Sequence, residues 1–126
     1  MSLRHPLALA RGLGSAKDGV GHWWVQRLTA MALLLLAPWF TWLALSLVGA
    51  DHFTVRQTLA QPLNASLLLA FVLSLFWHAQ LGMQVVIEDY IQNEKLKLAS
   101  VMANSFFCIA VALASIYAIL KMSSGV

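Results

Sequence analysis

One histidine lies in the middle of a long apolar stretch of the chain. His78 falls within residues 65–87, a run that contains no Lys, Arg, Asp or Glu. An ionisable side chain at membrane depth costs several kcal/mol, which makes it a candidate for function by default. His78 precedes Ile87 by nine residues. In a helix this separation is about 13–14 Å, which places the imidazole near the middle of a hydrocarbon core about 30 Å thick.

Three roles fit a histidine at this depth. Neutral imidazole is the usual nitrogen ligand for protein-bound metals, including haem iron. The small residues Ala79 and Gly82 nearby would let a flat porphyrin approach the helix. The same ring could instead bond to a neighbouring helix, or relay a proton. Spacing alone leaves these three roles open.

A second cluster, Glu88-Asp89-Tyr90, follows the apolar run. Eleven residues separate His78 from Asp89, close to three helical turns, so both lie on one face, roughly 16 Å apart along the axis. The Tyr90 phenol can donate a hydrogen bond to a carbonyl oxygen, such as that of a quinone head group. Asp89 could supply protons when that group is reduced. The structural alternative is an interfacial tyrosine beside solvated acids that end the helix.

Arg27 precedes the first apolar run and has two interpretations as well. Its guanidinium could clamp an anionic group such as a haem propionate, or it could reach the interface as a charge that fixes topology. The other histidines, His5, His22 and His52, lie outside the apolar runs and are expected to be solvated. A six-coordinate haem at His78 would therefore need its second axial nitrogen from another membrane-embedded subunit.

The composition excludes most soluble functions. The chain has 126 residues, of which 60% are hydrophobic and 10% charged, against roughly 25% charged in an ordinary soluble domain. This supply cannot cover a water-exposed surface, which excludes a cytosolic enzyme and a disordered tail. Eight Lys and Arg are too few and too scattered for a module that binds nucleic acid. The single cysteine, Cys108, provides neither a disulfide framework nor a cysteine metal site.

Three apolar stretches are long enough to cross a bilayer as helices, which takes about 20 residues each. The predicted transmembrane helices cover residues 28–49, 65–87 and 98–120. Helix is the only plausible spanning form, because three strands cannot close a barrel and satisfy their backbone groups. The expected fold class is an all-α membrane protein, with a three-helix transmembrane anchor over residues 28–126.

The segments between these helices carry most of the polar residues. Residues 1–27 are predicted to form a cytoplasmic N-terminal segment, irregular because it is rich in glycine. Residues 50–64 are expected to form a polar loop, with Asn64 as the N-cap of the second helix. Pro38 is expected to bend the first helix. Asn104 is expected to form an interhelical hydrogen bond from the third helix, whose small residues recur at helical spacing.

Lysine and arginine are distributed unequally over the two sides of the membrane. One side holds Arg4, Arg11, Lys17, Arg27, Lys95 and Lys97, and the other holds Arg56 and Lys121. The positive-inside rule therefore places the N-terminus in the cytoplasm and the C-terminus in the periplasm. The lack of a recognisable transit peptide favours a bacterial inner membrane over a mitochondrial one.

The residues around His78 resemble a known signature. The stretch His78-Ala-Gln-Leu-Gly-Met-Gln-Val-Val-Ile-Glu-Asp89-Tyr90 resembles the pattern H-x(3)-G-x(6)-D-Y of the small hydrophobic anchor subunits of succinate dehydrogenase, respiratory complex II. The segments Gly14-Ser-Ala-Lys-Asp-Gly and His22-Trp-Trp-Val-Gln-Arg27-Leu-Thr-Ala are similar to the start of alphaproteobacterial members. The resemblance covers essentially the whole chain.

The resemblance implies one half of a heterodimeric helical anchor that binds haem b and ubiquinone in succinate:ubiquinone oxidoreductase. His78 matches the axial haem ligand from this subunit, and the second anchor subunit gives the other ligand. Tyr90 matches a tyrosine bonded to a ubiquinone carbonyl, Asp89 the neighbouring acid, and Arg27 an arginine near the haem propionates. The implied partners are the second anchor subunit, the iron–sulfur subunit, the flavoprotein subunit and the lipid bilayer.

Two other functions stay open on the sequence. The anchor of a quinol:fumarate reductase has the same architecture and serves the reverse reaction. A non-redox scaffold or a transporter subunit could also have three helices and one buried histidine. Transport would require a path lined by polar residues, and only Gln80 and Gln84 accompany His78, which counts against it.

Overall fold

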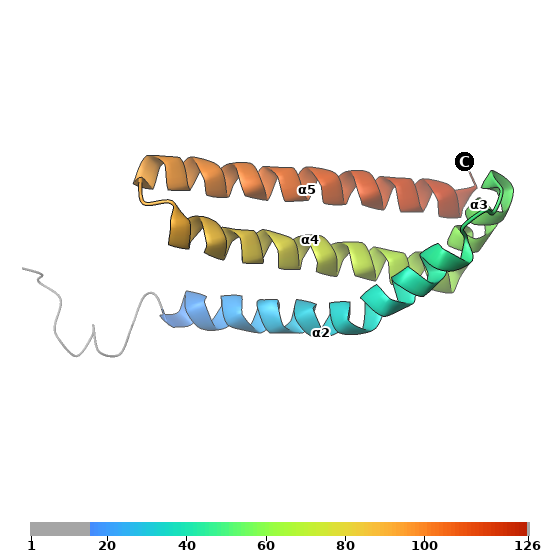
Figure 1. Ribbon diagram of the computed structural model, residues 1–126, viewed down its shortest axis with the longest axis horizontal. Coiled ribbons are helices and arrows are strands. Elements are labelled where there is room, and N and C mark those ends of the chain that lie inside the picture. Colours follow the sequence, from blue (N-terminus) through green and yellow to red (C-terminus); the bar gives the residue numbers. More distant parts are fainter. Residues whose placement is uncertain (1–15, 126) are drawn as a thin grey trace, which may run out of the picture.

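The computed structural model describes residues 16–125, which fold into four helices (Figure 1). They are α2 (Ala16–Ser46), α3 (His52–Ala60), α4 (Pro62–Tyr90) and α5 (Glu94–Ser124). This part of the chain contains no strand. The predicted all-α fold class is confirmed.

The three long helices lie side by side in one layer, with α4 in the middle (Figure 1). Helices α2 and α5 each pack against α4 and not against each other, while the short α3 contacts α4 and α5 at one end of the layer. A helix in the middle of a single layer has neighbours on two sides only. Both broad faces of α4 are therefore left for lipid or for helices of another chain.

Three helices are long and apolar enough to span a membrane: Val20–Ser46, Pro62–Tyr90 and Glu94–Ser124. Their large apolar side chains point outward. Leu34 and Leu35, for example, are 74% and 76% exposed, and no large side chain of the described residues is fully buried. A water-soluble protein would hide such side chains, whereas a bilayer solvates them. The prediction of three membrane-spanning helices is confirmed.

The first helix begins at Ala16, well before the predicted start at residue 28. The expected irregular course of the N-terminal segment is thus wrong for residues 16–27, while residues 1–15 lie outside the described part. Gly19 and Gly21 are accommodated inside the helix because a glycine costs only about 1 kcal/mol relative to alanine. In or near lipid, leaving backbone groups without partners would cost more.

The loop predicted for residues 50–64 contains the helix α3. Asp51 caps it, since its side chain accepts a hydrogen bond from the Thr54 amide at 3.3 Å. Helix α4 then starts at Pro62, which suits the first turn because proline lacks the amide hydrogen that would have no partner there. Asn64 is therefore not the N-cap of α4. It lies inside the first turn, and its side-chain amide donates to the Thr58 carbonyl at 2.9 Å.

The tightest apolar packing lies at the end of the layer nearest α3. The buried residues there are Leu43, Ala65, Leu68, Val72 and Ile119. Phe40 and Phe71 stack beside this core, with ring centroids 4.7 Å apart. Helix α2 contains Pro38 and bends in its C-terminal part, as that proline predicted (Figure 1). The other half of the layer, which holds His78, contains most of the interhelical polar contacts.

Candidate functional site

His78 faces α2 from the middle of α4. Its Nδ1 atom lies 3.1 Å from Oγ1 of Thr29, across the interface between the two helices. Thr29 is only 6% exposed, and the imidazole is half-buried. A hydroxyl and an imidazole at this depth find no hydrogen-bond partner in hydrocarbon, so their pairing avoids a desolvation cost. Nothing in the sequence marks Thr29 as a partner of His78.

The Thr29 hydroxyl also contacts its own helix. Oγ1 lies 2.8 Å from the carbonyl oxygen of Val25 and 3.0 Å from that of Gln26, the usual bonds of a threonine inside a helix. His78 has no hydrogen bond at its other ring nitrogen, Nε2, from any residue the structure describes. One side of the ring is thus held by α2, and the other side keeps its bonding capacity.

Gln26 and Gly82 meet about one helical turn from this pair. A Cβ atom placed on Gly82 would lie 3.7 Å from the side-chain nitrogen of Gln26, an ordinary van der Waals distance. The glycine expected to make room for a porphyrin therefore lies beside a side chain of its own subunit. Within the described residues, the amide oxygen Oε1 of Gln26 is buried and has no hydrogen-bond partner.

Arg27 lies inside α2, eleven residues after its first residue, Ala16. The prediction placed it just before the helix, which was expected to start at residue 28. It precedes Thr29 by two residues, so its backbone lies within about 3 Å of the His78 level along the helix axis. The side chain is exposed, and its Cζ atom lies 5.3 Å from the centroid of the Trp23 ring. A guanidinium at this depth needs an anion or access to the interface.

Asp89 and Tyr90 end helix α4 and do not contact His78. Both are exposed, Tyr90 at 82%. Tyr90 follows His78 by twelve residues, which is about 18 Å along the helix. Within this chain, His78 and the polar residues at the end of α4 are therefore far apart along the helix, as the spacing predicted.

A different set of polar side chains lies between α4 and α5. Gln80 donates to Oγ of Ser105 at 3.1 Å, and Asn104 donates to the Gln80 carbonyl at 3.1 Å, which confirms the interhelical bond predicted for Asn104. Along α4, Gln80 donates to Gln84 at 3.3 Å and Gln84 to Glu88 at 3.0 Å. These amides therefore bond to partners within the chain.

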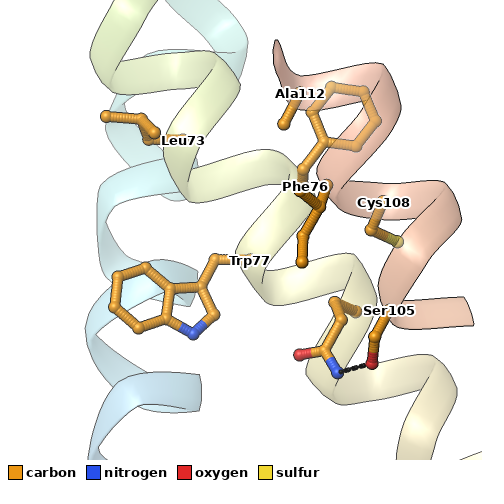
Figure 2. A pocket seen from close by; sticks show the side chains of 8 residues that line it. Leu73, Phe76, Trp77, Ser105, Cys108 and Ala112 are labelled. Carbon is orange, nitrogen blue, oxygen red and sulfur yellow. Dashed lines mark hydrogen bonds between the residues drawn. The ribbon is translucent and has the colours of Figure 1, made fainter. Parts of the chain in front are cut away.

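The same interface encloses a pocket of about 370 Å³ with mainly apolar walls. Figure 2 shows Ser105, Cys108 and Ala112 of α5 opposite Phe76 of α4, with Leu73 and Trp77 farther along the wall. In its wall, the side-chain nitrogen of Gln80 donates to Ser105, and the thiol of Cys108 lies 3.7 Å from Oδ1 of Asn104. The pocket therefore presents mainly apolar surface.

No second histidine of the described residues lies at the level of His78. His22 precedes Thr29 on α2 by seven residues, which is about 10 Å along the axis, and His52 begins α3 at one end of the layer. Nor do the residues from 16 to 125 contain a cluster of three or more His, Cys, Asp or Glu side chains that could hold a metal ion. The described residues therefore offer no second imidazole at the level of His78.

Comparison with known proteins identifies the family. Residues 1–112 match the profile of the succinate dehydrogenase/fumarate reductase transmembrane subunits. The chain belongs to this family. The resemblance found in the His78 motif is thus confirmed.

Several curated relatives are similar over most of their length. The succinate dehydrogenase hydrophobic membrane anchor subunit of Rickettsia bellii is 39% identical, over 92% of this chain and 93% of that protein. The corresponding subunit of Paracoccus denitrificans is 31% identical, over 95% and 92%. A succinate dehydrogenase membrane anchor subunit of Reclinomonas americana is 36% identical, over 68% and 73%. No solved structure gives a significant match.

These relatives and the three apolar helices agree on a multi-pass membrane anchor of the succinate dehydrogenase type. Electron transport is the process in which such anchors take part. The family assignment applies to the chain as a whole. The chemistry of individual residues has to be argued from the geometry of the interface between α2 and α4.

Proposed function

We propose that this chain is the small anchor subunit of a succinate:ubiquinone oxidoreductase and that His78 provides one axial ligand of a b-type haem. One observation carries the proposal: a half-buried imidazole at mid-membrane depth has one nitrogen bonded to Thr29 and, among residues 16–125, no partner at the other. This second ring nitrogen is the atom that could bind iron.

The residues present fit a haem. An imidazole nitrogen is a standard axial ligand of haem iron, and the apolar surroundings of α2 and α4 suit the porphyrin faces. Arg27, at nearly the same level, offers a guanidinium whose fork geometry matches a propionate carboxylate. When bound, the haem supplies an iron that accepts and releases one electron. The chain's own residues would orient it: His78 would hold the iron, and Arg27 would bind the propionates.

The geometry supports a second anchor subunit as partner. The other axial nitrogen would come from another chain, since of the histidines that the structure describes neither His22 nor His52 lies near His78. Within residues 16–125, the long helices α2 and α5 flank α4 on two sides, so its broad faces leave room for the helices of a second subunit. The iron–sulfur subunit and the flavoprotein subunit would complete the assembly and deliver electrons from succinate.

Tyr90 and Asp89 form this chain's part of the proposed quinone-reduction site. They lie at the end of α4, about 18 Å along the helix from His78, where a head group meets the edge of the hydrocarbon core. The exposed Tyr90 hydroxyl donates a hydrogen bond to a ubiquinone carbonyl oxygen, which favours the charge that develops there on reduction. Asp89 passes protons from water to the quinone oxygens.

We further propose a bacterial inner membrane, with the N-terminus cytoplasmic and the C-terminus periplasmic. An odd number of membrane-spanning helices would put the two termini on opposite sides. Six of the eight Lys and Arg precede the first apolar run or lie in the segment just before the third, and the positive-inside rule assigns that side to the cytoplasm. Asp89 and Tyr90 lie on this side too, so protons for quinone reduction come from the cytoplasm.

A quinol:fumarate reductase anchor is the second candidate, because the family description covers both enzymes. The two differ in the quinone that copurifies and in the favoured direction of turnover. Purification of the tagged chain in mild detergent, with mass spectrometry of its partners and its quinone, distinguishes them. Recovery without a flavoprotein and without a haem absorption band would instead indicate a non-redox scaffold.

Replacing the Tyr90 hydroxyl tests the quinone site. Tyr90→Phe in the purified complex should lower succinate:ubiquinone reductase activity about 10-fold or more, since a bond to developing charge is worth about 1.5–3 kcal/mol. Oxidation of succinate with a soluble dye should persist. Tyr117→Phe is the matched control, because Tyr117 is also exposed but belongs to α5. Unchanged quinone reduction in Tyr90→Phe would remove this residue from the site.

A further inference from the structure

We infer that Thr29 is a positioning residue for the haem ligand: its hydroxyl fixes the tautomer and the orientation of the His78 ring. The inference rests on the proposed function, which makes His78 an axial ligand. It assigns a role to a residue of α2 that acts only through another side chain.

The hydrogen bonds of Thr29 decide which ring nitrogen carries the proton. A threonine hydroxyl has one hydrogen, and here two backbone carbonyls, of Val25 and Gln26, lie 2.8 and 3.0 Å from Oγ1. With that hydrogen directed to its own helix, the oxygen meets Nδ1 of His78 as an acceptor at 3.1 Å. Nδ1 therefore donates, and the lone pair of the neutral imidazole lies on Nε2, where iron can bind it.

The contact also fixes the direction of the ring. Thr29 belongs to α2 and His78 to α4, so rotation of the imidazole would break a bond between two packed helices. Thr29 is 6% exposed, and water cannot readily replace it as the partner of Nδ1. The direction in which Nε2 points is thus fixed before any ligand binds.

Two consequences follow for a haem bound at Nε2. An acceptor on Nδ1–H raises the basicity of the ligating nitrogen and favours ferric iron, so its loss shifts the midpoint potential upward. A ring without this bond is free to turn, which weakens its hold on the iron. Loss of such an outer hydrogen-bond partner typically costs 10–100-fold in metal affinity.

Thr29→Ala and Thr29→Ser in the assembled complex form the decisive pair, because they differ by a single oxygen atom. Thr29→Val adds a variant of the original shape without the hydroxyl. Thr41→Val is the control, since the Thr41 hydroxyl bonds only to the Ala37 carbonyl of its own helix, at 2.9 Å. The measurements are the haem-to-flavin ratio, the rate of haem transfer to excess apomyoglobin, and the midpoint potential from a redox titration of the reduced-minus-oxidised spectrum.

Thr29→Ala and Thr29→Val should release haem about 10-fold faster or more and show a raised midpoint potential. Thr29→Ser and Thr41→Val should match the wild type in both measurements. Wild-type behaviour of Thr29→Ala would overturn the inference. Equal loss in Thr29→Ala and Thr29→Ser would also overturn it, because the effect would then come from packing and not from the hydroxyl.

His78→Ala separates this inference from the function on which it rests. If the low-spin b-type spectrum survives His78→Ala, His78 is not the ligand and both proposals fail. If the spectrum is lost in His78→Ala while Thr29→Ala behaves as wild type, the ligand assignment holds and only the role of Thr29 is rejected.

Discussion

Helix α4 has two interfaces of opposite character at nearly the same depth. Toward α5, the amides of Gln80 and Asn104 bond to partners inside the chain, next to a pocket with apolar walls. Toward α2, His78 and Gln26 each keep one polar atom without a hydrogen-bond partner among the described residues. The donors on the α5 side thus hold two helices of this chain together, whereas on the α2 side one ring nitrogen of His78 is left for the ligand proposed above.

The two interfaces show that polar residues of similar hydropathy in one membrane helix can have different surroundings. Two residues apart on α4, His78 and Gln80 face different helices and have different surroundings. Hydropathy alone treats them as two similar interruptions of an apolar run. What distinguishes them in the structure is the helix that each contacts: the side-chain nitrogen of Gln80 donates to Ser105 of α5 and to Gln84, whereas Nδ1 of His78 contacts Thr29 of α2.

The largest effect is expected when alanine replaces one polar residue at each of the two interfaces in turn. His78→Ala should abolish the low-spin b-type haem spectrum of the purified complex, because the axial nitrogen is removed. Gln80→Ala should leave that spectrum unchanged, since it removes bonds only toward α5 and along α4. Absorption spectra of matched preparations, normalised to flavin, measure the effect. Loss of haem in both variants would erase the contrast between the interfaces.

A smaller effect is expected when the interface with α5 is weakened by itself. Asn104→Ala removes the bond to the Gln80 carbonyl, and interhelical hydrogen bonds in membranes contribute about 0.6 kcal/mol, with a maximum of about 1.7. Unfolding in detergent should report this loss of stability, with the haem spectrum preserved. Ser115→Ala is the control, because its hydroxyl bonds only to Val111 of its own helix at 2.8 Å. A changed haem potential in Asn104→Ala would contradict the separation of the two interfaces.

The smallest effect is expected outside both interfaces, where water competes for polar groups. Hydrogen bonds from Thr54 lower the pKa of Asp51 below its ordinary value of 3.8. The carboxylate therefore stabilises the start of α3 above pH 3.8, and this contribution is lost as the pH falls through the lowered pKa. Hydrogen exchange of the first α3 amides should speed up slightly in this acid range.

Asp51→Asn provides the comparison for that measurement. An asparagine can still accept the cap hydrogen bond, but it does not titrate. The acid-induced loosening of α3 should therefore be absent from this variant. The same pH dependence in wild type and Asp51→Asn would show that another group causes it.

Much of the architecture could be predicted from the sequence. Three charge-free apolar runs required three helices, since a backbone in lipid must satisfy its own hydrogen bonds. The predictions from the sequence were wrong at the helix boundaries. Glycines near residue 20 did not end α2, and a polar segment from Asp51 onward formed the helix α3. Helix α4 starts at Pro62 and not after Asn64, because proline lacks the amide hydrogen that would have no partner in the first turn.

The sequence also singled out His78, Asp89, Tyr90 and Arg27, and a motif pointed to the family that the comparisons confirm. Thr29 was missed. A threonine in an apolar run is common, and nothing along the chain says that residues 29 and 78 are neighbours.

The amino-acid sequence by itself determined that this chain is a membrane protein and how many times it crosses the membrane. It also determined which residues are chemically conspicuous there. Those properties depend on local composition and on helical periodicity. Only the tertiary structure decided which of these side chains are already paired and which are not. That distinction depends on the register of α2 and α5 against α4, a long-range property of packing that local periodicity does not contain.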